Sequence, residues 1–261
     1  MKIITWNINS IRLRIGHLKT LLEQQMPDIV CLQEIKVADE FFPLEEVKAI
    51  GYEHVYFAGQ KSYNGVAILS RVAVTNVQRI KFVNEDTRHI SVMLPGNIEV
   101  HNFYIPSGGD EPDPLINQKF DHKLKYLDAV EYWLKTEKSK NDKIILVGDL
   151  NIAPLDNDVW SHKQLINEVS HTAIEIEKLD KIYNSLEFVD ALRKFVPASE
   201  KLYSWWSYRN RDWKKSNRGR RLDHIWTTPV LNDNIKTSYI LKEARDWVLP
   251  SDHVPVVLEL K

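Results

Sequence analysis

The chain has 261 residues, of which 43% are hydrophobic, 27% charged and 10% aromatic. This composition is typical of a folded globular protein and excludes a disordered chain, a collagen-like repeat and a fibrous coil. The 35 basic and 36 acidic side chains leave a formal net charge of -1. That balance argues against a protein that binds nucleic acid over its whole surface. The length fits one domain with a large core, so we expect residues 1–261 to form a single domain.

The predicted elements, in chain order, are strands with three stretches of helical spacing among them. The strands are expected at 3–8, 28–33, 66–70, 74–82, 89–94, 98–105, 144–148, 222–227, 235–241 and 254–260. The helices are expected at 13–25, 120–138 and 172–186. Runs of strands without regular intervening helices favour antiparallel or mixed sheets with helices outside, and this number of strands fits two facing sheets.

The compartment is predicted from what the chain contains. Its one cysteine, Cys31, lies in an apolar strand and is typical of a buried thiol in a reducing compartment. No apolar run approaches the ~18–20 residues of a membrane span, and the first residues enter a strand pattern without the sections of a secretory signal. We expect a cytoplasmic protein without a membrane partner, and nothing in the sequence requires a dimer.

Polar side chains stand at the ends of five predicted strands. They are Asn7, Glu34, Asp149 with Asn151, Asp223, and Asp252 with His253. Each alone also fits a turn or a cap. Strand ends of a packed sheet tend to converge on one rim, however, and the loops there build sites. Carboxylate and amide oxygens with one histidine and no cysteine favour Mg²⁺ or Mn²⁺ over zinc.

Two pairs within this set suggest a reaction. Asp149 and Asn151 follow a strand, where alternation would put both side chains on one face. Asp149 would then orient a water and Asn151 would hold an oxygen of the substrate. Asp223 beside His253 would favour the imidazolium, which suits the charge of a phosphoryl transition state. His224 should point to the opposite face of the sheet, outside the site.

The segment 204–221 combines basic and aromatic residues. Seven Lys or Arg and one Asp lie between Arg209 and Arg221, and three of the eight Trp lie in the whole segment. A solvated loop pinned by core aromatics is one interpretation. Beside a metal site, a surface for a phosphate backbone and stacked bases fits better. The expected nucleic-acid contacts are Trp205, Arg209, Arg211, Trp213, Lys214, Arg218 and Arg220.

Eight short motifs follow one another along the chain. They are TWNIN at 5–9, LQEIK at 32–36, FFPLEE at 41–46, YNGVAI at 63–68, NFYIP at 102–106, GDLNIAP at 148–154, NRGRRLD at 217–223 and SDHVP at 251–255. With these motifs the chain resembles the exonuclease III family of apurinic/apyrimidinic (AP) endonucleases. The resemblance implies a four-layer α/β sandwich, in which two mixed β-sheets pack face to face and are flanked by helices. It also implies Mg²⁺-dependent cleavage of double-stranded DNA 5′ to abasic sites, with 3′-5′ exonuclease and 3′-end trimming; Mn²⁺ is expected to substitute.

The resemblance assigns roles to individual residues. The implied metal set is Asn7, Glu34, Asp149, Asn151, Asp252 and His253. The implied catalytic set is Tyr104, Asp149, Asn151, Asp223 and His253. Asp149 would orient the attacking water, Asn151 and Tyr104 would contact the phosphate, and the His253–Asp223 pair would stabilise developing charge. Whether Asp149 or His253 is the general base stays open.

Two departures from the family and two other functions stay open as well. Ser107 stands where some members have Asn, and Arg220 stands where a bulky apolar or aromatic residue often lines the abasic-sugar pocket. Arg220 would change the preference among abasic, 3′-blocked and normal ends.

A phosphoesterase of the same superfamily could instead act on a small phosphate such as an inositol phosphate or a sphingolipid headgroup. An inactive nucleic-acid-binding module is the other alternative, although every expected acid is present.

Overall fold

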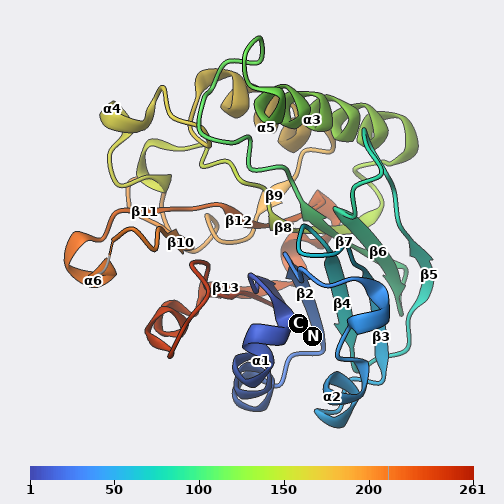
Figure 1. Ribbon diagram of the computed structural model, residues 1–261. Helices are drawn as coiled ribbons and strands as arrows, with labels where there is room; N and C mark the ends of the chain where they lie inside the picture. The colour runs from blue at the N-terminus through green and yellow to red at the C-terminus, as the bar shows by residue number, and fades with distance from the viewer. Residues whose placement is uncertain (211) are drawn as a thin grey trace.

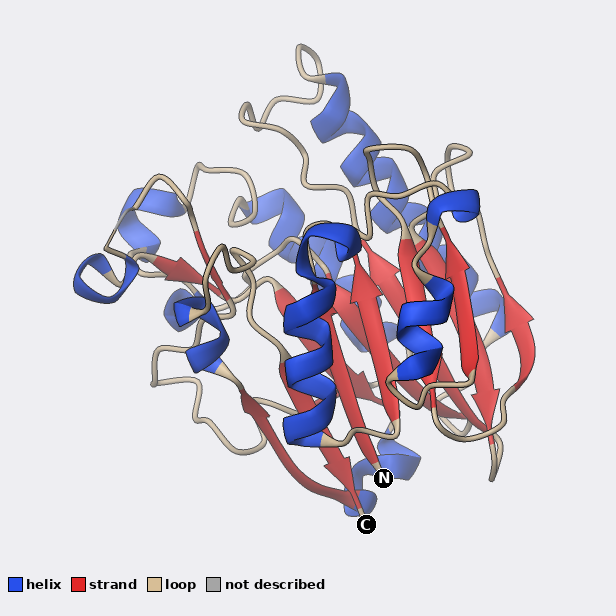
Figure 2. Ribbon diagram, turned by 60° about the horizontal axis from the view of Figure 1, so that its bottom comes forward, coloured by secondary structure: helices blue, strands red, loops and turns tan. Residues whose placement is uncertain are grey.

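The computed structural model describes residues 1–210 and 212–261. Over these residues the strands form two six-stranded sheets that face each other, and helices cover both outer sides (Figure 1, Figure 2). The expected four-layer α/β sandwich is therefore confirmed.

The first sheet has the strand order β13-β14-β1-β2-β4-β3. The strands are β1 (Lys2–Asn7), β2 (Ile29–Gln33), β3 (His54–Ala58), β4 (Val66–Ser70), β13 (Ile235–Ile240) and β14 (Val256–Leu260). Only the β1–β2 neighbours among them run parallel, as a crossover through a helix requires. β14 pairs with β1, so the two ends of the chain meet in this sheet (Figure 1).

The second sheet has the order β5-β6-β7-β8-β12-β9. The strands are β5 (Thr75–Gln78), β6 (His89–Leu94), β7 (Ile98–Tyr104), β8 (Lys143–Asp149), β9 (Val189–Asp190) and β12 (Asp223–Thr227). β7 and β8 are parallel, and the other pairs are antiparallel. A small ribbon of β10 (Trp205–Trp206) and β11 (Gly219–Arg220) stands apart from both sheets.

Helices form the outer layers. α1 (Ile11–Gln25) and α2 (Leu44–Ala49) cover the first sheet, while α3 (Gln118–Glu137) and α5 (Ala173–Ser185) lie together on the second (Figure 1). A capping box at the start of α5, made by Thr172 and Glu175, satisfies backbone N–H groups of its first turn. The short helices are α4 (His162–Leu165) and α6 (Trp213–Ser216), with 3₁₀ turns at Asp39–Phe41, Asp156–Asp158, Pro229–Asn234 and Lys242–Asp246.

Three apolar layers hold these elements together. The central one lies between the sheets and includes Ile3, Cys31, Ile68, Val100 and Val147, all with no exposed surface. The other two lie between each sheet and its helices. Burial raises the pKa of the Cys31 thiol well above its usual range, so this side chain belongs to the core, as expected.

Several predicted boundaries were wrong for identifiable reasons. The strand His54–Ala58 was missed because four of its five residues are only partly buried, which blurs the alternation. The last strand begins at Val256 rather than at 254, because Pro255 has no N–H for a sheet ladder. The strand expected at 74–82 ends at Gln78, where its register with β6 is already irregular.

In the described part of the chain, every helix is too short or too polar to cross a bilayer.

Candidate active site

Strand register brings the predicted polar residues to one rim. Tyr104 of β7 is paired with Asp149 of β8, and Asp149 is paired with Asp223 of β12, so one rung crosses three strands. On the facing sheet, Asn7 of β1 is paired with the residue that precedes Glu34. The convergence of strand ends expected from the sequence is therefore present.

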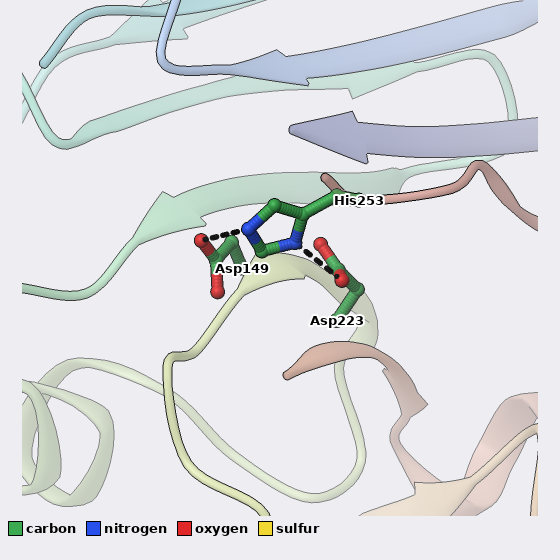
Figure 3. Close-up of side chains that lie close together, drawn as sticks. All are labelled: Asp149, Asp223 and His253. Carbon is green, nitrogen blue, oxygen red and sulfur yellow. Dashed lines mark hydrogen bonds and ion pairs between the residues drawn. The ribbon is translucent and has the colours of Figure 1, made fainter. Parts of the chain in front are cut away.

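His253 lies between two carboxylates of this rim (Figure 3). Its Nδ1 is 2.8 Å from Asp223 Oδ2, and its Nε2 is 3.7 Å from Asp149 Oδ2. Burial alone would lower the pKa of His253, but the charges of Asp223 and Asp149 override burial and raise it to about 10. The ring is therefore an imidazolium at neutral pH. Ser204 Oγ donates to the same Asp223 oxygen at 2.6 Å and helps to orient the carboxylate.

Asn7 joins the acids of the two sheets through its nitrogen. Its Nδ2 donates to Glu34 Oε1 at 3.0 Å and to Asp149 Oδ2 at 2.8 Å. Its Oδ1 accepts from the Asn9 backbone at 3.1 Å. The amide oxygen, which the predicted metal-binding role needs, therefore points away from the acids in this arrangement.

Glu34 is held in its charged form. Burial by itself would raise the pKa of the Glu34 carboxyl. Lys36 Nζ lies 2.5 Å from Glu34 Oε2, however, and its positive charge lowers this pKa below the usual value. The Tyr104 hydroxyl donates to Glu34 Oε1 at 2.8 Å. Burial, together with the charges of Glu34 and Asp149, raises the pKa of Tyr104, so its hydroxyl stays protonated and acts as a donor.

Asp149 and Asn151 meet through a turn rather than through strand alternation, which corrects the expected reason for their proximity. β8 ends at Asp149, and Asn151 adopts the left-handed region with φ 53°. Asn151 donates from its backbone N to Asp149 Oδ1 at 3.0 Å and from Nδ2 to Asp149 Oδ2 at 3.1 Å. Gly148 precedes them with φ 141°, where a Cβ would lie 1.9 Å from the Phe103 carbonyl oxygen. Only glycine allows β7 and β8 to approach so closely at this point.

The acids have the chemistry of a site for a hard divalent cation. Burial raises the pKa of Asp149 to about 7, and the charge of Asp223 adds to this effect while His253 opposes it. Asp149, Asp223 and His253 could together hold a metal ion. However, Asp223 and His253 already satisfy each other, and an imidazolium is not a ligand. The carboxylates of Glu34 and Asp149, which Asn7 joins, therefore fit a cation better.

A cleft of about 600 Å³ opens beside the acids. It is lined by Glu34, Asn151, Asp252 and His253 from the rim, and by Trp205, Arg209, Arg218 and Arg220 from the basic segment. Two Arg–Trp pairs stand in its wall: Arg220 lies 5.6 Å from the ring of Trp205, and Arg218 lies 4.7 Å from Trp160. Trp205 Nε1 donates to Asp252 Oδ2 at 2.9 Å and connects this wall to the acids.

Other residues predicted to bind nucleic acid lie elsewhere. Trp213 is buried against Trp206, with ring centroids 5.1 Å apart, so its faces are not free for stacking. Lys214 pairs with Asp246 at 2.7 Å and lines a different depression. Arg211 lies outside the described residues. His224 bonds to the Ile152 carbonyl oxygen through Nε2 at 2.8 Å, outside the cleft as expected.

Three residues that shape the site were given no role from the sequence, although Asn9 stands with Asn7 at the end of the first predicted strand. Asn9 donates from Nδ2 to Asp252 Oδ1 at 2.9 Å, and Lys36 donates to Asn9 Oδ1 at 2.7 Å. Both residues lie inside recognised motifs, which was the available signal. Ser204, which contacts Asp223, precedes the tryptophan pair, and the sequence contains no signal for its role.

Acids on the facing ends of two sheets, a charged His–Asp pair and a basic cleft define an α/β-sandwich phosphoesterase. The chain belongs to the Endonuclease/Exonuclease/phosphatase family, whose sequence model matches residues 4–253.

Individual relatives cover the whole chain. The exodeoxyribonuclease III of Haemophilus influenzae is 33% identical over 274 residues, covering 100% of both chains. The structure of an AP endonuclease from Archaeoglobus fulgidus superimposes with a TM-score of 0.92 at 34% identity, covering 100% of this chain and 99% of that one. A 3′ phosphatase from Neisseria bound to a product DNA hairpin gives a TM-score of 0.91 at 31% identity, also covering 100% of this chain and 99% of that one.

Proposed function

We propose that this chain is a DNA-repair phosphodiesterase of the exonuclease III type. It cleaves double-stranded DNA 5′ to abasic sites, shortens DNA from 3′ ends and clears blocked 3′ termini. The observation that carries the proposal is the charged His253–Asp223 pair beside Asp149, in a cleft whose wall presents three arginines. Three cations in one wall can contact several phosphates of a polymer, whereas a single small phosphate does not require them all.

The proposed cofactor is Mg²⁺, with Mn²⁺ able to replace it. Glu34 and Asp149 would hold it, with Asp252 nearby on the same cleft, because carboxylate oxygens suit a hard cation. When bound, the cation neutralises charge on the phosphoryl group and polarises its oxygens.

The protonation states divide the roles between Asp149 and His253. A ring that already carries its proton cannot accept another, so His253 serves as a donor to a phosphoryl oxygen. Asp149 is then the group that orients a water and accepts its proton as the water attacks phosphorus in line. Asn151 and Tyr104 add neutral donors to the oxygens of the transition state.

Residues 1–261 act as one catalytic domain and as a monomer. The lone buried thiol of Cys31 is compatible with work in the reducing cytoplasm.

The test is a product assay on three duplexes: one abasic, one with a 3′-blocked nick and one with a plain recessed 3′ end. An inositol phosphate and a sphingolipid are included as alternative substrates. We expect the abasic duplex to be nicked with Mg²⁺ or Mn²⁺ and to stay intact in EDTA. Cleavage of the small phosphates alone would refute the DNA assignment, and binding to DNA without any cleavage would indicate an inactive module.

A further inference from the structure

A buried ion pair lies close to the cleft but is not part of its lining. It joins Lys123 of α3 to Glu175 of α5 at 2.5 Å, and neither side chain has any exposed surface. The two helices lie next to each other over the second sheet (Figure 1).

Lys123 is bonded to two segments of the cleft wall. Its Nζ donates to the Asn151 carbonyl oxygen at 2.8 Å and to the Ser107 carbonyl oxygen at 3.2 Å. Asn151 and Ser107 both line the cleft. The ammonium thus uses its donors on Glu175 and on the backbone of two loops that come from different strands.

Glu175 is bonded to a third segment. Both of its oxygens accept from the Ser170 backbone N, at 3.0 and 2.9 Å, and Oε2 also accepts from the Thr172 hydroxyl at 2.7 Å. Ser170 lines the cleft as well. Its Oγ, together with the Val169 carbonyl oxygen, accepts from Arg220 Nη1 at 2.6 Å. The ion pair is therefore connected to the arginine that lies over Trp205.

Stability alone is a poor explanation for this pair. Removing two charges from water costs several kcal/mol per ion, and packed apolar residues of similar volume often serve a fold equally well. Apolar side chains could not bond to the carbonyls of Asn151 and Ser107, and the Asn151 carbonyl would stay buried without this donor. Asn151 is also held in the left-handed backbone region, so the orientation of its peptide group depends on such contacts.

We propose that Lys123 and Glu175 are positioning residues for the reaction. They hold the Asn151 peptide in the conformation that presents its side chain beside Asp149. They also set the distance between the Ser107 and Ser170 walls of the cleft. This inference rests on the proposed function, because it assigns the pair to the geometry of the same site.

The test removes both charges together. Lys123→Met/Glu175→Gln retains the volume and leaves no unpaired buried charge. The matched control is Lys178→Met/Asp128→Asn, which removes a more exposed ion pair between the same two helices. Circular dichroism and thermal melting establish that both variants are folded.

Cleavage activity is then measured with the abasic duplex as substrate, and amide hydrogen exchange is measured on the free protein. Because small displacements of a reacting group cost up to about 100-fold, we expect kcat of the double variant to fall about 10- to 100-fold while KM changes less than about threefold. Deuterium should enter residues 149–153 and 168–172 faster than in the parent. The control variant should match the parent in every measurement.

A folded double variant with the kcat and the exchange of the parent would overturn the inference. If that variant does not fold, Glu175→Asp replaces it, because this change keeps the charge and withdraws the carboxylate from Ser170. Faster exchange at 168–172 and a lower kcat would support the inference, and parental values would overturn it. If parent and control both fail to cleave DNA, the proposed function is refuted, whereas the exchange data still decide the role of the pair.

Discussion

His253 has an acidic partner at each ring nitrogen: Asp223 Oδ2 lies 2.8 Å from Nδ1, and Asp149 Oδ2 lies 3.7 Å from Nε2. The two aspartates come from neighbouring strands and are paired in register, so the sheet itself sets their spacing. Histidine reaches them from the loop that precedes the last strand. The charges of the two aspartates raise the pKa of the ring to about 10, which is why the proposed mechanism assigns the role of proton acceptor to Asp149.

Replacing Asp149 by Asn is expected to abolish cleavage and to leave DNA binding largely intact. The amide retains the size of the side chain but cannot accept a proton, so kcat should fall at least ~10²–10³-fold. Gel assays give kcat, and fluorescence anisotropy in EDTA gives the dissociation constant. Asp180→Asn, an exposed change on α5, is the control. Turnover near that of the parent would refute the role of Asp149.

Replacing Asp223 by Asn should lower the pKa of His253, because the nearest negative charge disappears. Proton NMR of the imidazole Cε1–H then shows a titration that begins at lower pH than in the parent. We expect kcat to fall by about 10²–10³-fold, as when a preorganised donor is lost. An unchanged titration would mean that Asp223 does not hold the charge on the ring.

His224 is expected to make the fold less stable in acid. It is fully buried, and burial lowers its pKa from 6.5 to about 4. Between pH 6.5 and about pH 4, His224 is protonated in the unfolded chain but stays neutral in the folded chain. The free energy of unfolding therefore decreases as the pH falls through this range, by up to about 3 kcal/mol. Above pH 6.5 this contribution does not change.

Urea unfolding in EDTA at several pH values measures this effect. His224→Gln removes the titrating group while retaining a donor for the Ile152 carbonyl oxygen. The variant should therefore lose less unfolding free energy in acid than the parent does. Some loss should remain, because burial also lowers the pKa of His89, His101 and His171. Equal slopes for parent and variant would exclude His224 as a contributor.

Arg220→Leu should change the preference among DNA ends. The guanidinium lies over Trp205 and is bonded to the 169–170 segment, so leucine widens the cleft and removes a cation from its wall. We expect cleavage of the abasic duplex to rise relative to digestion of a plain recessed 3′ end. Lys214→Leu, in the same segment but outside the cleft, should leave this ratio unchanged. Identical ratios for Arg220→Leu and the parent would remove Arg220 from the specificity of the site.

The salt dependence of DNA binding should reflect a small contact area. Three arginines line the cleft. Each phosphate neutralised contributes about -0.9 to the slope of log binding constant against log salt concentration, so a slope of about -3 is expected. Anisotropy titrations in EDTA at several salt concentrations measure the slope. A much steeper value would place the binding surface outside the cleft.

The sequence alone determined which strands end in acids or amides, because apolar runs that stop at Asn7, Glu34 or Asp149 are visible without a structure. It also predicted the Asp223–His253 pair and the four layers, through eight motifs that lie in order. These features are local, and each depends on a few neighbouring residues.

Apart from the Asp223–His253 pair, only the tertiary structure decided which charged side chains meet and which are buried. The basic segment reads as one patch, yet packing buries Trp213, pairs Lys214 with Asp246 and leaves Arg218 and Arg220 on the cleft. Lys123 and Glu175 are 52 residues apart and carry no motif, and they meet because two helices pack on one sheet. Protonation states also depend on the tertiary structure. A pKa depends on the burial and the neighbours of a group, and contacts between distant parts of the chain set both.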